Sequence, residues 1–185
     1  MTELSEKKVA FLTAPEGVER VELEDPWTAV EDSGAAPVLI STEPGEVRTF
    51  DHLDAAGKRT VDRTVAEVSV DDFDALVLPG GVANPDALRQ DDDAVAFVRE
   101  FVASGKPVAA ICHAGWMLAE ADVVRDRTVT SWPSLRTDLS NAGANWVDQE
   151  VVTDGNLITS RNPGDLPAFN NAVLEALAHG AAGTD

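Results

Sequence analysis

The chain has 185 residues and a formal net charge of −19, because 33 acidic residues stand against 14 lysines and arginines. So few basic side chains cannot neutralise a run of phosphates, which excludes nucleic acid and anionic membrane surfaces as expected partners. Hydrophobic residues make up 44% of the chain, enough for one domain with a substantial core. We expect this domain to span 1–185, with frayed tails at 1–7 and 180–185.

An acidic, lysine-poor surface is typical of proteins that stay soluble in concentrated salt, where a Debye length of roughly 3 Å screens self-repulsion. The sequence therefore suggests a halophilic source, with an ordinary acidic soluble protein as the alternative. A single cysteine excludes an intrachain disulfide, and no apolar run resembles a signal peptide or a membrane span. We expect a cytoplasmic protein.

Strand and helix alternate along the first half of the chain. A short apolar run predicts a buried strand at 8–14, and acids with helical spacing predict a helix over 19–33. A second strand is expected at 34–41. The polar segment 43–66 suggests short strands or a hairpin. Residues 73–81 predict another buried strand, which ends in two glycines.

The same alternation continues in the second half. The apolar spacing of 91–105 predicts a helix that ends in Ser-Gly, followed by a strand in 106–115. The remaining expected elements are a helix at 116–122, a strand at 127–132, a helix at 134–143, strands at 146–155 and 156–160, and a helix at 165–180. This order predicts a doubly wound α/β fold, with a mostly parallel sheet sandwiched by helices.

Three of the expected strand ends carry residues with chemical potential. They are "TAPEGVERVE" after the first strand, "PGGVANPD" after the strand at 75–79, and "CHAG" after the strand at 107–111. Ligands of parallel α/β sheets bind at the carboxyl ends of the strands. We therefore expect these three segments to converge on one site.

Cys112 lies where a buried strand turns into a helix. Such an elbow lifts a nucleophilic side chain above the sheet, and the positive end of the helix dipole favours a thiolate. The alternative is a buried, inert cysteine, which is a common state of this residue. Position alone does not decide between them.

Several segments resemble the PfpI/ThiJ family, a group of intracellular cysteine hydrolases described as proteases, glyoxalases and deglycases. The similarity runs from about residue 8 to 178 and includes "EGVERVELEDP", "FDALVLPGG", "GKPVAAICHAG" and "TSWPSLRTDLSNAGANWVDQEVVTDG". It implies a flavodoxin-like fold of the class I glutamine amidotransferase-like type. Members differ in activity, so the resemblance implies the family more firmly than one reaction.

The resemblance implies a role for each strand end. Cys112 matches the nucleophile, His113 the base that follows it, and Glu22 the carboxyl group that lies against the sulfur. Glu19 matches a second acid of the same pocket. Asp86 aligns with a glutamate that reaches the histidine from a neighbouring subunit, which implies a homo-oligomer, from dimer to hexamer.

The resemblance also suggests pocket residues. Gly80 and Gly81 match a turn whose N–H groups face a developing oxyanion, although they could form only a tight turn. Arg161 matches an arginine that could orient a carboxylate or hold a loop. The family usually reads Cys-His-Gly-Pro, so Ala114 and the bulky Trp116 depart from it. We expect them at the mouth, where they would narrow or re-aim the pocket.

Each of these residues has a structural alternative. Glu19 and Glu22 could be favourable acids in the first turn of a helix, and Asp86 could cap a helix. Neighbouring side chains normally point apart, so His113 is not an obvious partner for the cysteine and could only order the elbow. Arg161 could form a structural ion pair.

The expected function is that of a PfpI-type cysteine hydrolase acting on small peptides or on methylglyoxal adducts, without a metal or cofactor. The alternative is a redox sensor without turnover, since a low-pKa cysteine oxidises readily. A glutamine amidotransferase needs a distant His-x-Glu pair. Neither His52 nor His179 has a glutamate two residues after it, which excludes that activity.

Overall fold

The structure, a computed structural model, describes residues 4–180. A seven-stranded sheet runs through its centre in the order β11-β12-β8-β7-β1-β3-β6. Its strands are β1 (Lys8–Thr13), β3 (Ala36–Ser41), β6 (Arg63–Thr64), β7 (Ala75–Leu78), β8 (Val108–Ile111), β11 (Val151–Asp154) and β12 (Leu157–Ser160). All neighbours pair in parallel except β11 and β12. The predicted, mostly parallel sheet is confirmed.

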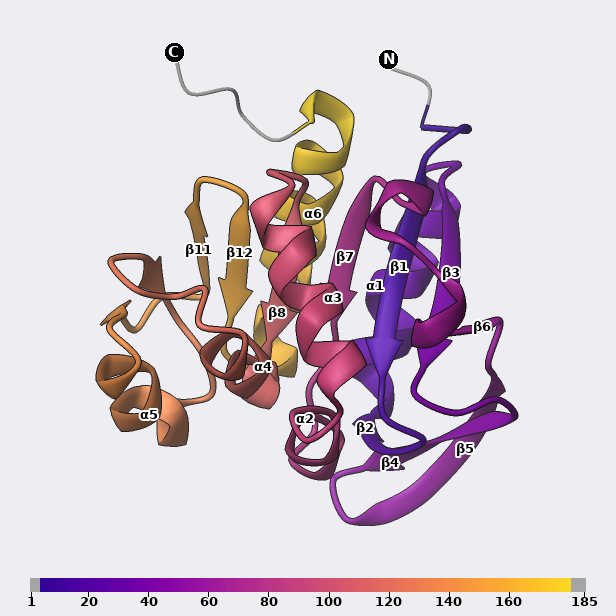
Figure 1. Ribbon diagram of the computed structural model, residues 1–185, viewed down its shortest axis with the longest axis horizontal. Coiled ribbons are helices and arrows are strands. Elements are labelled where there is room, and N and C mark those ends of the chain that lie inside the picture. The colour runs from indigo at the N-terminus through magenta and orange to yellow at the C-terminus, as the bar shows by residue number, and fades with distance from the viewer. Residues whose placement is uncertain (1–3, 181–185) are drawn as a thin grey trace.

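Helices cover both faces of this sheet (Figure 1). The helices α1 (Arg20–Asp32) and α6 (Leu166–His179) pack on one face, and α3 (Asp92–Ala103) and α4 (Gly115–Glu120) pack on the other. Alternate residues of β1 serve the two faces, because successive side chains of a strand point in opposite directions. Val9 and Phe11 join the α1/α6 side, whereas Ala10 and Leu12 join the α3/α4 side.

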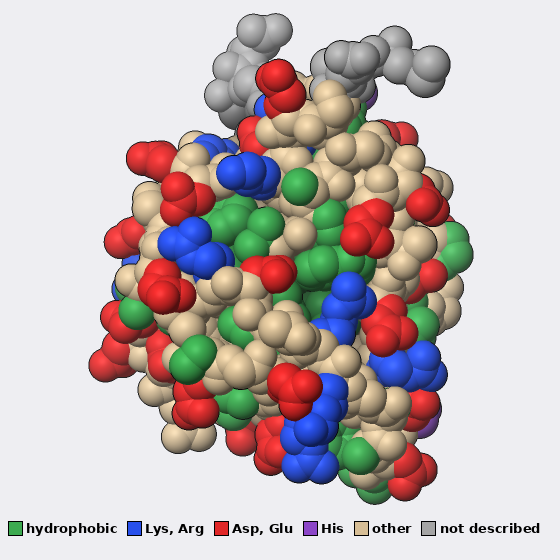
Figure 2. Space-filling model, turned by 90° about the vertical axis from the view of Figure 1, so that its right-hand side faces the viewer, with side chains coloured by type: hydrophobic (Ala, Val, Ile, Leu, Met, Phe, Trp, Pro, Cys, Tyr) green, Lys and Arg blue, Asp and Glu red, His purple; other side chains and the backbone are tan. Residues whose placement is uncertain are grey.

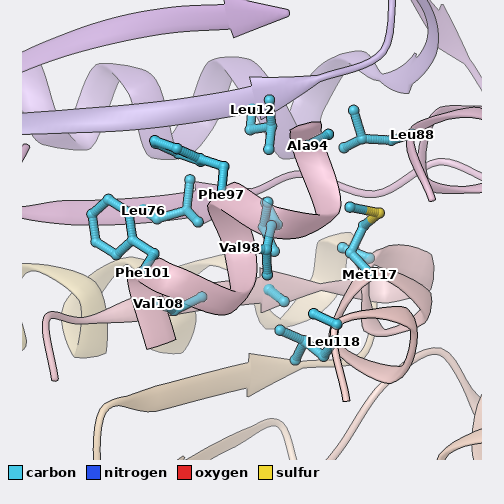
Figure 3. Packing of buried hydrophobic residues seen from close by; sticks show 14 of the residues in the cluster. Leu12, Leu76, Leu88, Ala94, Phe97, Val98, Phe101, Val108, Met117 and Leu118 are labelled. Carbon is cyan, nitrogen blue, oxygen red and sulfur yellow. The ribbon is translucent and has the colours of Figure 1, made fainter. Parts of the chain in front are cut away.

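The helix α3 illustrates how the core follows from apolar spacing. Its start is capped by Asp91, whose Oδ1 accepts a hydrogen bond from Ala94 N–H at 2.8 Å. Its inner face places Phe97, Val98 and Phe101 against the strands (Figure 3). Because this face of α3 packs closely against the central sheet, it helps to hold the carboxyl ends of the strands in place.

A second, smaller sheet lies beside the carboxyl ends of the central strands. It contains β2 (Glu16–Glu19), β4 (Glu46–Asp51) and β5 (Asp54–Thr60), in that order. The hairpin expected within 43–66 is confirmed as β4–β5. The strand β2 was not predicted, since its four residues "EGVE" carry no apolar pattern.

The remaining elements complete the outer layer. They are α2 (Ala83–Leu88), β9 (Thr128–Val129), α5 (Arg136–Asn141) and β10 (Asn145–Trp146), together with short 3₁₀ turns. The strand predicted over 146–155 is divided between β10 and β11, and the strand predicted over 127–132 is reduced to β9.

The surface reflects the composition. Acidic side chains outnumber basic ones and are spread across the face in Figure 2. Within residues 4–180, no helix has the length and apolar character needed to cross a membrane.

Candidate active site

A cavity of about 700 Å³ opens at the carboxyl ends of β1, β7 and β8. In Figure 1 the arrowhead of β1 points to this end, near the labels of β2, β4 and α2. The three segments singled out in the sequence all reach this cavity. The predicted site residues that line it are Glu19, Glu22, Gly81, Asp86, Cys112 and His113.

Cys112 stands at a strained elbow between β8 and α4. Its φ of 63° lies in the left-handed region, which costs a non-glycine residue roughly 1–2 kcal/mol. Trp132 N–H donates to Cys112 O at 3.1 Å and helps to hold this conformation. The side chain lines the cavity although the residue is only 6% exposed. The sequence prediction of an elbow agrees with this geometry.

His113 contacts the cysteine, as the base implied by the resemblance would, although neighbouring side chains normally point apart. Cys112 Sγ and His113 Nδ1 are 3.1 Å apart, because the unusual φ at Cys112 turns the two neighbours toward the same side. The imidazole is stacked on Trp132, with ring centroids 5.4 Å apart, and Trp116 meets it edge-on at 5.3 Å. Burial lowers the pKa of His113, which favours the neutral ring.

Asp86 lines the same cavity without contacting this histidine. Within residues 4–180, the His113 imidazole hydrogen-bonds only the Cys112 sulfur, so no carboxylate orients its Nε2. Asp86 lies inside α2, whose N-cap position is Val82. The alternative of Asp86 as a helix cap is therefore wrong.

Glu22 is a fully buried carboxyl group in the first turn of α1. Its Oε2 accepts a hydrogen bond from Gly80 N–H at 2.9 Å, whereas its Oε1 has no hydrogen-bond partner among the described residues. Burial raises the pKa of Glu22 to about 7, although the neighbouring Cys112 side chain lowers it in part. Glu22 is therefore buried much more deeply than an acid that only stabilises the start of a helix on the surface.

The thiol and the carboxyl group form a coupled pair. Burial, and then the Glu22 carboxylate, raise the pKa of Cys112 far above its usual range, while the His113 and Gly81 N–H groups lower it in part. A thiolate stabilised by the helix end was expected. Desolvation of the sulfur and the neighbouring Glu22 carboxylate act against that effect and favour the protonated thiol.

Gly80 permits the close approach of these two groups. A Cβ at this position would lie 2.7 Å from the Cys112 Cβ and would also collide with Glu22 Oε2. The Gly80 N–H was expected to face a developing oxyanion. It donates to Glu22 Oε2 instead, so it is not free to bind an oxyanion. Gly81, with a φ of 80°, lines the cavity, and its N–H and that of His113 face the sulfur.

Three other predicted pocket residues lie outside the cavity. Ala114 is buried in the core on the α3/α4 side. Trp116 lies behind His113, and its Nε1 donates to Asp138 Oδ2 at 2.8 Å. The expectation that these two side chains narrow the mouth is therefore wrong.

Arg161 is the third predicted pocket residue that lies outside the cavity. It donates to both carboxylate oxygens of Asp165 at 2.9 Å and to Asp148 Oδ1 at 2.8 Å. Its geometry is that of the structural ion pair given as its alternative role.

Glu19 ends β2 and immediately precedes α1 at the edge of the cavity. Its Oε2 accepts a hydrogen bond from the His52 N–H at 3.1 Å, which ties the start of α1 to the β4–β5 turn. Glu19 precedes the first turn of α1 and makes no side-chain capping bond, so it does not act as the helix-start acid.

Sequence reasoning missed the apolar wall of the cavity. This wall includes Phe50, Leu53, Val82 and Trp132. Leu53 lies at the tip of a hairpin and Val82 directly follows the glycine turn. Nothing in the apolar pattern distinguishes either from an ordinary surface residue. Within residues 4–180, no group of three metal-ligating side chains is close enough to hold an ion.

Comparison with known proteins agrees with this site. The DJ-1/PfpI family signature matches residues 7–176. The chain belongs to the DJ-1/PfpI family. Protein/nucleic acid deglycase 2 of Escherichia coli is 43% identical over 172 residues, covering 92% of this chain and 98% of its own. Deglycase PfpI of Pyrococcus furiosus is 42% identical over 170 residues, covering 92% and 99%.

Solved structures of the family share the fold. Drosophila melanogaster DJ-1beta superposes with a TM-score of 0.85 at 31% identity, covering 94% of this chain and 91% of its own. A two-domain protein of Anabaena variabilis with DJ-1/ThiJ/PfpI-like and ferritin-like domains gives 0.89 at 36% identity. The match covers 97% of this chain and 50% of that protein. The names of the curated relatives point to an enzyme.

Proposed function

We propose that this protein is a cysteine-dependent deglycase that hydrolyses methylglyoxal adducts of amines or thiols. The observation that carries the proposal is the buried Glu22 carboxyl group beside Cys112. Its pKa of about 7 lets it accept and return a proton near neutral pH, as a general acid/base must. The deglycase names of two relatives support the same reaction class.

The chemistry can be written so that it balances. The Cys112 sulfur displaces the amine from the hemiaminal carbon, and the amine leaves with a proton. Glu22 then removes the hydrogen from that carbon as a proton and returns a proton to the adjacent carbonyl carbon, while the hydroxyl proton moves to the carbonyl oxygen, which gives an enzyme-bound lactoyl thioester. Water hydrolyses the thioester, so that adduct and water yield free amine and lactate.

Each described residue has a task in this scheme. His113 Nδ1, at 3.1 Å from Sγ, can take the thiol proton during attack. The N–H groups of Gly81 and His113 face the sulfur, where they can donate to the oxygen that becomes negative. Gly80 N–H holds Glu22 in place.

Peptide hydrolysis is a second candidate, because a Bacillus subtilis relative, YraA, is named as a candidate cysteine protease. A peptidase of this kind uses an imidazole that is oriented by a third group. Within residues 4–180, His113 has no such partner. We propose that Asp86 of a second copy of this chain could supply it in an oligomer.

Exposed apolar side chains support such an assembly. The described residues include three exposed large apolar side chains, Leu53, Val82 and Trp132, and all three line the cavity. Sedimentation at working salt tests the assembly. A monomer would remove the proposed role of Asp86 and leave the deglycase scheme intact.

The redox-sensor alternative requires an exposed thiolate. Cys112 is only 6% exposed and lies in the cavity beside the buried Glu22, an arrangement that supports turnover over sensing. Mass spectrometry after mild peroxide distinguishes them. Selective sulfinate at Cys112 in a protein without hydrolytic activity would replace the deglycase proposal.

The decisive assay is release of lactate and free amine from a methylglyoxal hemiaminal, compared with cleavage of small peptides. We expect adduct hydrolysis, and we expect Glu22→Gln to lower kcat about 100-fold or more, the usual weight of a general acid/base. Arg161→Gln is the matched control, since Arg161 lies outside the cavity. Undiminished turnover in Glu22→Gln would refute the scheme.

A further inference from the structure

The cavity around Cys112 has a one-sided charge. In the part of the chain that the structure describes, four carboxyl groups line it, those of Glu16, Glu19, Glu22 and Asp86, and no lysine or arginine does. Its two imidazoles belong to His52 and His113. Burial lowers the pKa of His113, so that ring adds no positive charge at neutral pH.

Most of this negative charge is uncompensated. Glu16 is paired with Arg48 at 3.3 Å, and both are largely exposed. Within residues 4–180, Glu19 and Asp86 form no ion pair, because Glu19 receives only a backbone N–H and Asp86 no charged donor. The buried Oε1 of Glu22 has no hydrogen-bond partner among the described residues, and this side chain lines the cavity.

The walls strengthen the effect of these charges. Phe50, Leu53, Val82 and Trp132 line the same cavity with apolar surface, and Glu22 is fully buried there, whereas Glu16 and Asp86 lie at its exposed rim. A cleft that carries one sign of charge and has low-dielectric walls focuses the field, and it can raise the local concentration of a counter-ion 10- to 1,000-fold.

We infer that this site selects carbonyl adducts that carry a positive charge near the reacting carbon, such as adducts on a guanidinium- or ammonium-bearing molecule. It disfavours adducts that carry a carboxylate or a phosphate. The ammonium or guanidinium group lies against Glu19 and Asp86 while the carbonyl carbon meets the Cys112 sulfur. This selectivity rests on the proposed function for its substrate class, but it can be measured without turnover.

The test uses the single cysteine as its probe. In three methanethiosulfonate reagents, with a trimethylammonium-ethyl, a methyl and a sulfonatoethyl group, the Cys112 thiolate attacks the sulfenyl sulfur, which forms a mixed disulfide with the alkylthio group and releases methanesulfinate. Labelling rates are measured by intact mass at pH 8 and low salt, and each is divided by the rate with a free model thiol. We expect about a 100-fold preference for the cationic over the anionic reagent.

The whole protein is also strongly acidic, so local and global charge must be separated. Glu19→Gln and Asp86→Asn each remove one carboxylate of the cavity, whereas Glu175→Gln removes one from the exposed face of α6. We expect each cavity variant to reduce the preference about threefold and the double variant about tenfold. Glu175→Gln should change it by less than about 1.5-fold, since distant exposed charges are screened.

Two results would overturn the inference. One is a normalised preference near unity in the wild type, and the other is an equal loss in Glu175→Gln and in the cavity variants. The values of kcat/KM should also fall from cationic to neutral to anionic adducts. The substrates for this comparison are the methylglyoxal hemithioacetals of 2-(dimethylamino)ethanethiol, 2-mercaptoethanol and 3-mercaptopropionate, in that order. If labelling shows the preference and no adduct is hydrolysed, the proposed function fails and the charge selectivity stands. If adducts are hydrolysed without any order by charge, the selectivity fails alone.

Discussion

Replacing Glu22 by glutamine should remove a pH-dependent loss of stability. Glutamine keeps the shape of the side chain and an oxygen that can accept the Gly80 N–H bond. It cannot ionise, so the cost of burying a carboxylate disappears. The variant should therefore become more stable relative to the wild type as the pH rises.

The magnitude follows from the pKa of Glu22, which burial raises from 4.5 to about 7. At 1.36 kcal/mol per pKa unit, this shift corresponds to about 3 kcal/mol. Between pH 4.5 and 7 the folded protein binds more protons at Glu22 than the unfolded chain does, so the wild type loses stability as the pH rises through this window. Below pH 4.5 both states are protonated and the effect vanishes.

The assay is urea unfolding at pH 5 and pH 8, in wild type and Glu22→Gln, at constant salt. Groups common to both proteins cancel, so the change in their stability difference reports Glu22. We expect that change to be about 2–3 kcal/mol, equivalent to roughly 4–12 °C in melting temperature for a chain of this length. Repeating the pair in a Cys112→Ser background separates any titration of the thiol. A stability difference that is the same at both pH values would refute a buried Glu22 with a raised pKa.

Three further predictions concern packing, an ion pair and salt. Gly80→Ala should cost about 1–3 kcal/mol and lower turnover, because its Cβ collides with Glu22 and Cys112. Urea unfolding and a rate assay check it, and an unchanged variant would contradict the close approach. Arg161→Gln should lose about 1–3 kcal/mol with kcat retained, since it removes the partner of the buried Asp165. A large fall in kcat without a loss of stability would instead place it in catalysis. Molar KCl should raise the melting temperature by screening the net charge of −19, and full stability in dilute buffer would exclude salt adaptation.

Local patterns were sufficient to predict the central sheet and the elbow. The strands β1, β7 and β8 stand out as continuous apolar runs because both of their faces are buried, and a parallel sheet brings its strand ends together. Cys112 was predicted at a strand-to-helix turn for that reason. The carboxyl group of Glu22 was placed near it through the family resemblance.

Contacts that depend on distant residues could not be read in this way. Gly80 N–H binds Glu22 across 58 residues of sequence, which a local pattern does not reveal. The contact of His113 with Cys112 depends on a single backbone angle, and the apolar pattern of β8 carries no information about it. Trp116 looked like a pocket residue because it follows the elbow, but one helical turn carries it behind the histidine.

The direct test of the account is whether Cys112 carries out the reaction. Lactate and free amine released from a methylglyoxal hemiaminal should be measured for the wild type and for Cys112→Ser, with urea unfolding to show that both are folded. We predict a loss of at least about 1,000-fold in kcat, since the hydroxyl cannot replace the sulfur nucleophile. A folded Cys112→Ser variant that hydrolyses the adduct at the wild-type rate would contradict the proposed mechanism.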